Sequence, residues 1–252
     1  MLLNASELAA IGGGVALAAG AVAGGLAYAA YSPTSALFGR PLTAPRLYGN
    51  GPEEIALTFD DGPNPRCTPQ LLEVLARHNV RATFFLIGQY ATGQRELVRR
   101  THEAGHLIGN HTWTHPNLAR TSEERTREEL RRTSSELEQI LGAPVRYFRP
   151  PFGARRPATL LIARELGLIP VTWNVIGNDW NAASAQQIVR RVTRLMRKNQ
   201  QRGVATNLVL HDGSHRMAEA DRSRSVAATQ ELLERIIPTH RFVTLDAWEL
   251  GM

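Results

Sequence analysis

The chain of 252 residues contains a single cysteine, Cys67, so no disulfide can form within it. We find no nucleic-acid-binding motif, internal repeat or second domain, although the formal net charge is +6. Much of the basic excess falls in segments such as 95–100 and 125–132, which also contain glutamate and are typical of solvated helix faces. The length and an ordinary hydrophobic content of 43% therefore fit one sizeable α/β domain plus an extension.

Charge is missing from the N-terminus. No charged residue occurs between Glu7 and Arg40, and residues 8–31 contain only Ala, Gly, Val, Leu, Ile and Tyr. A helix of this length is about 36 Å long, enough to cross a hydrocarbon core of roughly 30 Å. We expect residues 1–31 to be a transmembrane or signal-anchor segment that holds an extracytoplasmic domain at the membrane of a bacterial envelope. The alternative is secretion after signal cleavage, although a positively charged n-region is missing.

The charges that flank this segment bear on its orientation in the membrane. Arg40 and Arg46 follow it and no Lys or Arg precedes it, so the positive-inside rule taken alone would place the domain in the cytoplasm. Long C-terminal domains can override that bias.

Residues 32–51 are rich in proline and glycine and are expected to form a linker that wraps onto a domain at 52–252. From there, apolar runs and amphipathic segments alternate. Strands are expected from residue 55 to the Gly62-Pro63 break and at 82–87, 106–109, 146–148, 169–175, 207–210 and 242–245. Seven strands that alternate with helices predict an α/β fold with a parallel sheet, closed or nearly closed as a (β/α)7-type barrel, with the N-terminal hydrophobic helix outside it.

The helices carry start and stop signals. Thr68, Thr121 and Ser184 are the expected N-caps, the latter two in capping boxes, and Gly142 is an expected left-handed stop. Further helices are expected at 96–104, 158–166 and 226–236.

Two adjacent carboxylates, Asp60 and Asp61, end the first strand. Neighbouring side chains on a regular strand point to opposite faces, so both can serve one site only if the backbone turns there. Gly62 makes such a turn easy, and a solvated Asp-Asp-Gly-Pro turn without function is the alternative.

Polar clusters also follow the later strands. His111 and His115 come after the third strand at a spacing that would put them on one face of a helical turn, but they lack the glutamate of a His-Glu-x-x-His motif. Further clusters lie at 149–153, 178–180 and 211–213. Every cluster follows a strand and none precedes one, and α/β folds place their sites at the carboxyl ends of strands.

Five of these segments resemble, in order and spacing, the motifs of the polysaccharide deacetylase family, the NodB-type homology domain of carbohydrate esterase family 4. They are Thr58-Phe59-Asp60-Asp61-Gly62, His111-Thr112-Trp113-Thr114-His115, Arg149-Pro150-Pro151-Phe152-Gly153, Asp179-Trp180 and Val209-Leu210-His211. The resemblance runs from about Pro52 to the C-terminus and implies a distorted (β/α)7-type barrel.

The resemblance implies a divalent metal, typically zinc, with cobalt or nickel as alternatives, bound by Asp61, His111 and His115. It implies that Asp60 is the general base that removes a proton from water. Arg149 would orient this carboxylate and keep it ionised.

On the other side of the site, the resemblance implies that His211 is the general acid that protonates the leaving amine, with Asp179 as its carboxylate partner. The backbone N–H of Phe152 would help to hold the tetrahedral oxyanion. Trp180 and Val209 would line the pocket for the acetyl methyl group.

The function that the resemblance implies is metal-dependent removal of N-acetyl groups from N-acetylglucosamine-containing polysaccharide, such as peptidoglycan or chitin oligomers. An esterase that removes O-acetyl groups from xylan-like polymers is one alternative. A non-catalytic carbohydrate-binding relative is another, and the intact set of polar residues argues against it. The expected partners are the glycan and the membrane, with no nucleic acid and no protein partner inferred. Glycan contacts are expected on the loops at 89–95 and 213–224.

Overall fold

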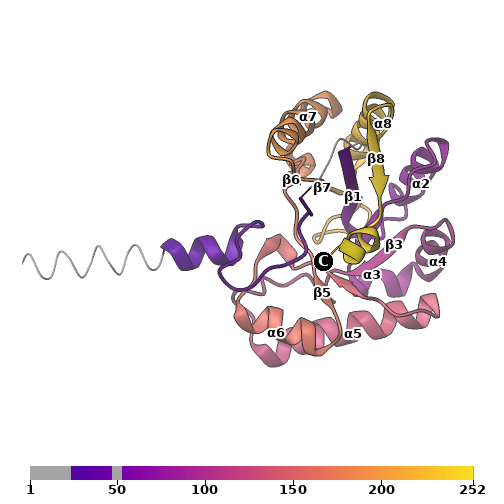
Figure 1. Ribbon diagram of the computed structural model, residues 1–252. Coiled ribbons are helices and arrows are strands. Elements are labelled where there is room, and N and C mark those ends of the chain that lie inside the picture. Colours follow the sequence, from indigo (N-terminus) through magenta and orange to yellow (C-terminus); the bar gives the residue numbers. More distant parts are fainter. Residues whose placement is uncertain (1–23, 47–52, 252) are drawn as a thin grey trace, which may run out of the picture.

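The computed structural model describes residues 24–46 and 53–251, in which parallel strands alternate with helices that lie outside them (Figure 1). The strands are β1 (Glu53–Gly62), β2 (Thr83–Leu86), β3 (Leu107–Asn110), β4 (Tyr147–Phe148), β5 (Ile169–Pro170), β6 (Val175–Ile176), β7 (Thr206–His211) and β8 (His240–Val243). Every pairing between them is parallel, which confirms the prediction from the alternating pattern.

The sheet is built around β1. Its strand order is β5-β4-β3-β2-β1-β7-β6, and β8 adds to β1. One edge of β1 pairs with β7, while the other pairs with β8 near Glu53 and with β2 from Thr58 onward. The central strand of the sheet is thus the one that ends in the two carboxylates.

A single segment of chain supplies both edges of the sheet, because β5 ends at Pro170 and β6 begins at Val175. The sheet therefore curls into a half-barrel whose two edges are joined by residues 171–174. The prediction of one strand at 169–175 is wrong for a physical reason: the segment changes partners. Val171 forms a bridge with Leu42, whereas the N–H of Asn174 donates to the carbonyl of Asn207.

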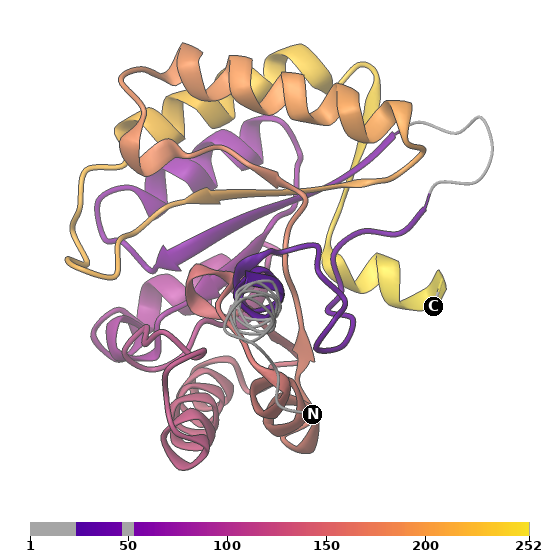
Figure 2. The ribbon, with the colours of Figure 1, turned by 90° about the vertical axis from the view of Figure 1, so that its left-hand side faces the viewer.

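The helices cover the outer face of the curled sheet, with α7 and α8 side by side on one side and α5 and α6 on another (Figures 1 and 2). They are α2 (Thr68–Arg77), α3 (Gly88–Gly93), α4 (Arg95–Glu103), α5 (Glu123–Leu141), α6 (Pro157–Glu165), α7 (Ala185–Gln201) and α8 (Ser223–Ile236), with 3-10 turns η1 (Pro151–Gly153), η2 (Asp179–Asn181) and η3 (Leu245–Gly251). The short α3 was not predicted.

The cap predictions were partly correct. Ser184 caps α7, and Gly142 ends α5 with a φ of 65°. The N-cap of α5 is Ser122 rather than Thr121, because the hydroxyl of Ser122 accepts the hydrogen bond from the first turn. Thr68 is the first helical residue of α2 rather than its cap; its hydroxyl instead accepts from a backbone N–H outside the helix and donates to Asp212.

Alternation along β1 separates two environments. Ile55, Leu57 and Phe59 belong to the large apolar cluster between the sheet and its helices. Ala56, two residues before Thr58 on the opposite face of β1, belongs to a smaller cluster inside the curl. Asp60 continues this second series, so its carboxylate lies inside the curled sheet.

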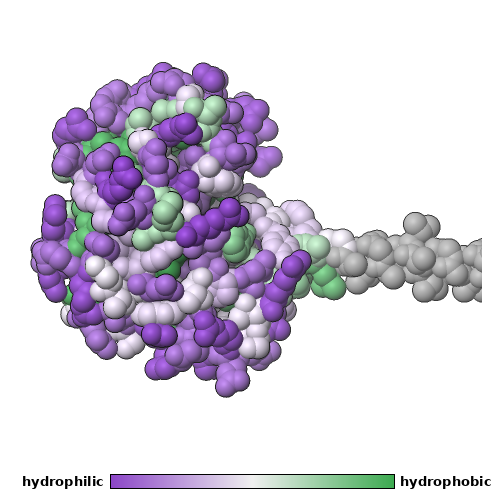
Figure 3. Space-filling view, turned by 180° about the vertical axis from the view of Figure 1, so that it is seen from behind, coloured by the Kyte–Doolittle hydropathy of each residue, from purple (hydrophilic) through white to green (hydrophobic). Residues whose placement is uncertain are grey.

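A helix at 24–31 projects from one side of the domain, and its last turn packs against the domain (Figure 1). Ala29 is buried, while Leu26 is half-exposed. The face of the domain drawn in Figure 3 is mainly hydrophilic, with smaller apolar areas. Residues 1–23 of the predicted membrane segment lie outside the described residues. Within the described ranges, no helix has both the length and the apolar character needed to cross a bilayer.

Residues 32–46, the described part of the predicted linker, lie against the domain. The guanidinium of Arg155 donates to the carbonyls of Ser32 and Ser35, both at 2.8 Å. Arg46 forms an antiparallel bridge with Val204. This segment therefore covers part of the half-barrel; residues 47–51 of the predicted linker lie outside the described residues.

Candidate active site

Asp60 and Asp61 reach the same side of β1 because the strand contains a bulge. Asp60 pairs with Phe85 of β2 and Gly62 with the next residue, Leu86, so Asp61 is the extra residue. Asp61 has a φ of 71°, a left-handed conformation that is uncommon for a residue with a side chain. The expected backbone turn therefore exists, but it lies at Asp61 itself. Such a strained conformation often occurs at functional sites.

The two motif histidines lie on an irregular loop, so the prediction of a helical turn at 111–115 is wrong. Thr112 and His115 have φ values of 68° and 59°, which interrupt any helical path. The buried carboxylate of Glu129, on α5, accepts hydrogen bonds from the backbone N–H groups of residues 113 and 114, both at 2.7 Å. Glu129 thus holds the loop in a shape that turns both imidazoles towards β1.

The carboxylate of Asp61 faces both imidazoles. Its Oδ1 atom lies 3.1 Å from Nε2 of His115 and 3.4 Å from Nε2 of His111. The Nδ1 atom of His111 lies 2.8 Å from the carbonyl oxygen of Arg149, which can only accept, so Nδ1 carries the proton. The other ring nitrogen, Nε2, faces Oδ1 of Asp61 and is the one that could bind a cation.

The donor set fits a divalent cation. The Oδ1 atom of Asp61 is buried and has no hydrogen-bond partner among the described residues. Burial raises the pKa of Asp61, but the hydrogen bonds of His111, His115 and His215 and the charge of His211 together lower it more, so it lies well below its usual value. Burial lowers the pKa of His115, which favours the neutral imidazole that metals require. Two ligands of one ion at 2.0–2.1 Å lie about 3.3 Å apart in a tetrahedral site, close to the distances around Oδ1.

Asp60 has a different partner. Its Oδ1 atom accepts a hydrogen bond of 2.8 Å from the guanidinium of Arg149, which is completely buried. Arg149 also donates to the hydroxyl of Thr58 at 2.6 Å and to the side-chain oxygen of Asn207 at 3.1 Å. This buried ion pair fixes the orientation of the Asp60 carboxylate. Thr58 and Asn207 were not predicted to belong to the site.

His211, at the end of β7, forms a second ion pair. Its Nδ1 atom lies 2.9 Å from Oδ1 of Asp179, and its backbone N–H donates to Oδ2 of the same carboxylate at 2.8 Å. The hydroxyl of Ser225 also donates to Oδ2, at 2.5 Å. Burial lowers the pKa of His211, but the attraction of Asp179 outweighs burial and raises it to about 9. His211 is therefore an imidazolium at neutral pH, before any cation binds nearby.

These groups open into one cleft of about 620 Å³. Eight of the ten predicted site residues line it, namely Asp60, Asp61, His111, His115, Phe152, Trp180, Val209 and His211. The other two, Arg149 and Asp179, lie behind Asp60 and His211 as their ion-pair partners. Trp180 packs edge-on against His211, with ring centres 5.0 Å apart, and with Val209 it forms an apolar side of the cleft.

The cleft also contains residues that were not predicted individually. They are Trp173, Ile176, Ser214, His215, Arg216, Ala220 and Arg222. Five of these residues, from Ser214 to Arg222, lie in the 213–224 loop that was expected to contact glycan. Nothing in the sequence distinguished His215 from the other residues of that loop, apart from its position four residues after His211.

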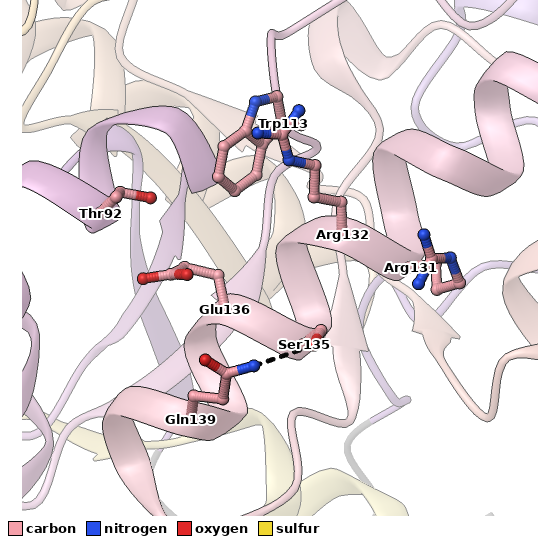
Figure 4. A pocket seen from close by; sticks show the side chains of 7 residues that line it. All are labelled: Thr92, Trp113, Arg131, Arg132, Ser135, Glu136 and Gln139. Atoms are coloured by element: carbon pink, nitrogen blue, oxygen red, sulfur yellow. Dashed lines mark hydrogen bonds between the residues drawn. The ribbon is translucent and has the colours of Figure 1, made fainter.

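A separate hollow of about 260 Å³ lies over α3 and α5 (Figure 4). It is lined by Thr92, Trp113, Arg131, Arg132, Ser135, Glu136 and Gln139. The guanidinium of Arg132 covers the ring of Trp113 at 3.8 Å from its centre. None of the ten predicted site residues lines this hollow, so the acid, base and cation-binding groups belong to the larger cleft alone.

A curled parallel sheet with a carboxylate–histidine cluster and an acid–base pair at its carboxyl edge defines a hydrolase-type site. Residues 48–171 match the sequence model of the family described as polysaccharide deacetylase. A chitooligosaccharide deacetylase of Sinorhizobium fredii is 37% identical over 202 residues, which cover 78% of this chain and 89% of that protein. The chain therefore belongs to the polysaccharide deacetylase family, the NodB-type domain of carbohydrate esterase family 4.

Two further similarities concern peptidoglycan deacetylases. A peptidoglycan-N-acetylglucosamine deacetylase of Bacillus cereus is 42% identical over 139 residues, which cover 55% of this chain but only 50% of that protein. The crystal structure of a peptidoglycan N-acetylglucosamine deacetylase in complex with an N-hydroxybenzamide superimposes with a TM-score of 0.70 at 33% identity. That match covers 82% of this chain and 90% of the other. The predicted parallel α/β architecture is thus correct, but the described residues form a curled half-barrel of eight strands rather than a seven-strand barrel that is closed or nearly closed.

Proposed function

We propose that this chain is a metal-dependent hydrolase that removes N-acetyl groups from N-acetylglucosamine-containing glycans, of the peptidoglycan or chitooligosaccharide type. The observation that carries the proposal is the division of the cleft into two differently charged sides. One side has a carboxylate and two imidazoles that are suited to bind a cation, with a positioned carboxylate beside them. The other has an imidazole kept protonated by a buried carboxylate. Hydrolysis of an amide needs both sides at once.

The first side activates water. Asp61, His111 and His115 would hold the divalent cation, most simply zinc, with cobalt or nickel as alternatives. When bound, the ion polarises the acetyl carbonyl and lowers the pKa of water. Asp60 is the proposed general base that accepts the proton of the attacking water. Its hydrogen bond to Arg149 holds the carboxylate in one orientation.

The second side would protonate the leaving sugar amine. His211 is the proposed general acid that gives its Nε2 proton to the nitrogen of the leaving sugar amine, since Nδ1 faces Asp179. The backbone N–H of Phe152 is the proposed donor to the oxyanion, and Trp180 with Val209 would accept the acetyl methyl group. All three line the cleft that holds His211.

The acid favours amides over esters as substrates. An amine must be protonated to leave, whereas an alkoxide from an O-acetyl ester depends less on a strong acid. A pKa of about 9 for His211 keeps that proton available at neutral pH. This supports N-deacetylation over O-acetyl hydrolysis of xylan-like polymers. The geometrically complete set of acid and base groups argues against a purely carbohydrate-binding role.

The test is acetate release from chitooligosaccharide, peptidoglycan and acetylxylan under identical conditions. We expect release from one or both N-acetylated glycans, loss of activity on chelation and recovery with Zn²⁺ or Co²⁺. Faster release from acetylxylan than from either N-acetylated glycan would favour the esterase. No release from any of the three by metal-loaded protein would favour the binding role.

We also propose that residues 1–31 hold the domain at the outer face of a bacterial membrane, where these glycans occur. The support is the run of 24 uncharged residues at 8–31 and its length relative to a bilayer. The helix at 24–31 continues directly into the segment that packs on Arg155, so an anchor would hold the domain close to the bilayer.

A further inference from the structure

His215, on the loop between β7 and α8, extends the cation-binding cluster on its open side. The Nδ1 atom of His215 lies 3.8 Å from Oδ2 of Asp61, whereas His111 and His115 face Oδ1 of the same carboxylate. One ligand atom each from Asp61, His115 and His215 fall within 4.8 Å of one another. The carboxylate of Asp61 thus has imidazole nitrogens on both of its oxygens.

The loop that carries His215 is fixed to the site. It lies beside the carboxyl end of β1 (Figure 2). Gly213 packs so closely on β1 that an added Cβ would lie 2.0 Å from the carbonyl oxygen of Asp61, so only glycine fits there. The carbonyl of Gly213 accepts from Nε of Arg222 at 2.6 Å, and the carbonyl of His215 accepts from the hydroxyl of Tyr90 at 3.1 Å. His215 is therefore held near Asp61 by its backbone.

The side chain of His215 is restrained as well, but less tightly. Its ring stacks on that of His115, with centres 4.5 Å apart and planes inclined by 11°, and Phe152 packs edge-on against both rings. The side chain remains 33% exposed, so it can rotate by a small amount. Two ligands of one ion at 2.0–2.1 Å lie at most about 4 Å apart, and the 3.8 Å between Nδ1 of His215 and Oδ2 of Asp61 falls within that span.

We infer that His215 is a fourth protein ligand of the divalent cation, in addition to Asp61, His111 and His115. The inference rests on the proposed metal-dependent function. Imidazole nitrogen is a suitable ligand for zinc, cobalt and nickel, and a fourth donor raises affinity for the ion. Four protein ligands leave space for water and the acetyl oxygen only if the ion takes five or six ligands. The additional donor therefore strengthens binding without filling every position.

The test measures metal binding, with Zn²⁺ and Co²⁺ as the only added ligands. The full chain, freed of metal and kept in mild detergent, is titrated in competition with a chromogenic chelator. Removal of groups that merely support metal ligands weakens binding by about 10–100-fold, so loss of a direct ligand should raise the Kd at least about tenfold. We expect this of His215→Ala, together with a changed Co²⁺ absorption spectrum.

Two further variants make the result specific. His215→Phe keeps a ring that can stack on His115 but has no nitrogen, so it should bind metal as weakly as His215→Ala. His78→Ala removes a half-buried histidine at the C-terminus of α2, where the chain returns to the start of β2 at the edge of the sheet opposite the cleft, and should leave the Kd unchanged. Thermal melting of the metal-free proteins checks that each variant folds.

The outcomes separate this inference from the proposed function. If His215→Ala binds Zn²⁺ and Co²⁺ with the wild-type Kd and spectrum, His215 is no ligand, even if the KM for glycan rises. Wild-type affinity in His215→Phe would assign the effect to stacking and would also overturn the inference. If His111→Ala weakens binding while His215→Ala does not, the proposed function stands and only the fourth ligand is lost. A wild-type chain that binds neither metal would contradict both.

Discussion

Replacement of Asp179 by asparagine tests the assignment of the acid most directly. The carboxylate of Asp179 contacts both the Nδ1 atom and the backbone N–H of His211, and it is buried. Asparagine has nearly the same shape but no charge, so the variant removes the attraction that keeps His211 protonated while burial still disfavours the charged form. The pKa of His211 should fall from about 9 to its ordinary value of 6.5 or below.

The expected loss of activity depends on pH. With a pKa of 9, about 90% of His211 is protonated at pH 8, and with a pKa of 6.5 only about 3% is. The variant should therefore lose about thirtyfold in kcat/KM at pH 8 but less than about twofold at pH 6 from this effect alone. A bound divalent cation lowers the pKa of His211 in both proteins, so the shift between them is the quantity to measure.

The assay is acetate release over pH 5–10 at one fixed metal loading, from which the alkaline limb of kcat/KM is read as an apparent pKa of the coupled site. Ser225→Ala is the matched control, because it removes one hydrogen bond to Asp179 and leaves the charge; its alkaline limb should move much less than that of Asp179→Asn. An alkaline limb in Asp179→Asn that coincides with that of the wild type would refute the role of Asp179 and, with it, the acid assigned to His211.

Four other predictions concern the acid and base, a metal ligand, the pH dependence of stability and the N-terminal segment. Asp60→Asn should lower kcat roughly 100-fold or more with folding intact, His211→Ala should be similarly damaging, and the double variant should be far less than multiplicatively worse, as kinetics at saturating metal would establish. His111→Ala should lose metal but keep its melting temperature in the metal-free form, since the ligand lies on a loop; a large drop in that temperature would contradict this. The folding free energy from the raised pKa of His211 is complete below pH 6.5 and is lost as the pH rises through about 9, so urea unfolding at pH 6 and pH 9.5 should differ more for the wild type than for Asp179→Asn. Full-length protein should sediment with membranes and a chain starting at residue 24 should not; soluble mature protein beginning near residue 30 would instead favour signal cleavage.

The succession of strands and helices along the chain and the parallel direction of the strands could be predicted from the sequence because they follow from local patterns. Ile55, Leu57 and Phe59 alternate along β1, and amphipathic segments separate one apolar run from the next, which leaves a parallel sheet as the consistent arrangement. The clustering of the polar motifs was predictable for the same reason, since the carboxyl ends of parallel strands meet at one edge. The eight cleft-lining residues of the motifs do lie together there.

The parts that sequence did not predict depend on contacts between distant segments. The division of 169–175 into β5 and β6 comes from the pairing of Val171 with Leu42 in the N-terminal segment. The support of the histidine loop by Glu129 requires α5 to pack beneath it, and nothing in the local pattern marks that glutamate as buried. His215 likewise reaches Asp61 only because the loop from β7 folds back over the end of β1.

Backbone conformation explains why the residues of this site could be predicted from the sequence while the shape of the loops that carry them could not. Six non-glycine residues among those described have a positive φ, and five of them belong to the site motifs or adjoin them: Asp61, Thr112, His115, Phe152 and Asn178. For Thr112, His115 and Phe152 such a conformation disfavours the folded state by roughly 1–3 kcal/mol, whereas Asp and Asn tolerate it better. The imidazole of His115 is therefore explained by its place in the site rather than by its backbone preference. The identity of the motif residues can therefore be predicted from the sequence. The left-handed turns that direct their side chains into the cleft depend on the surrounding packing.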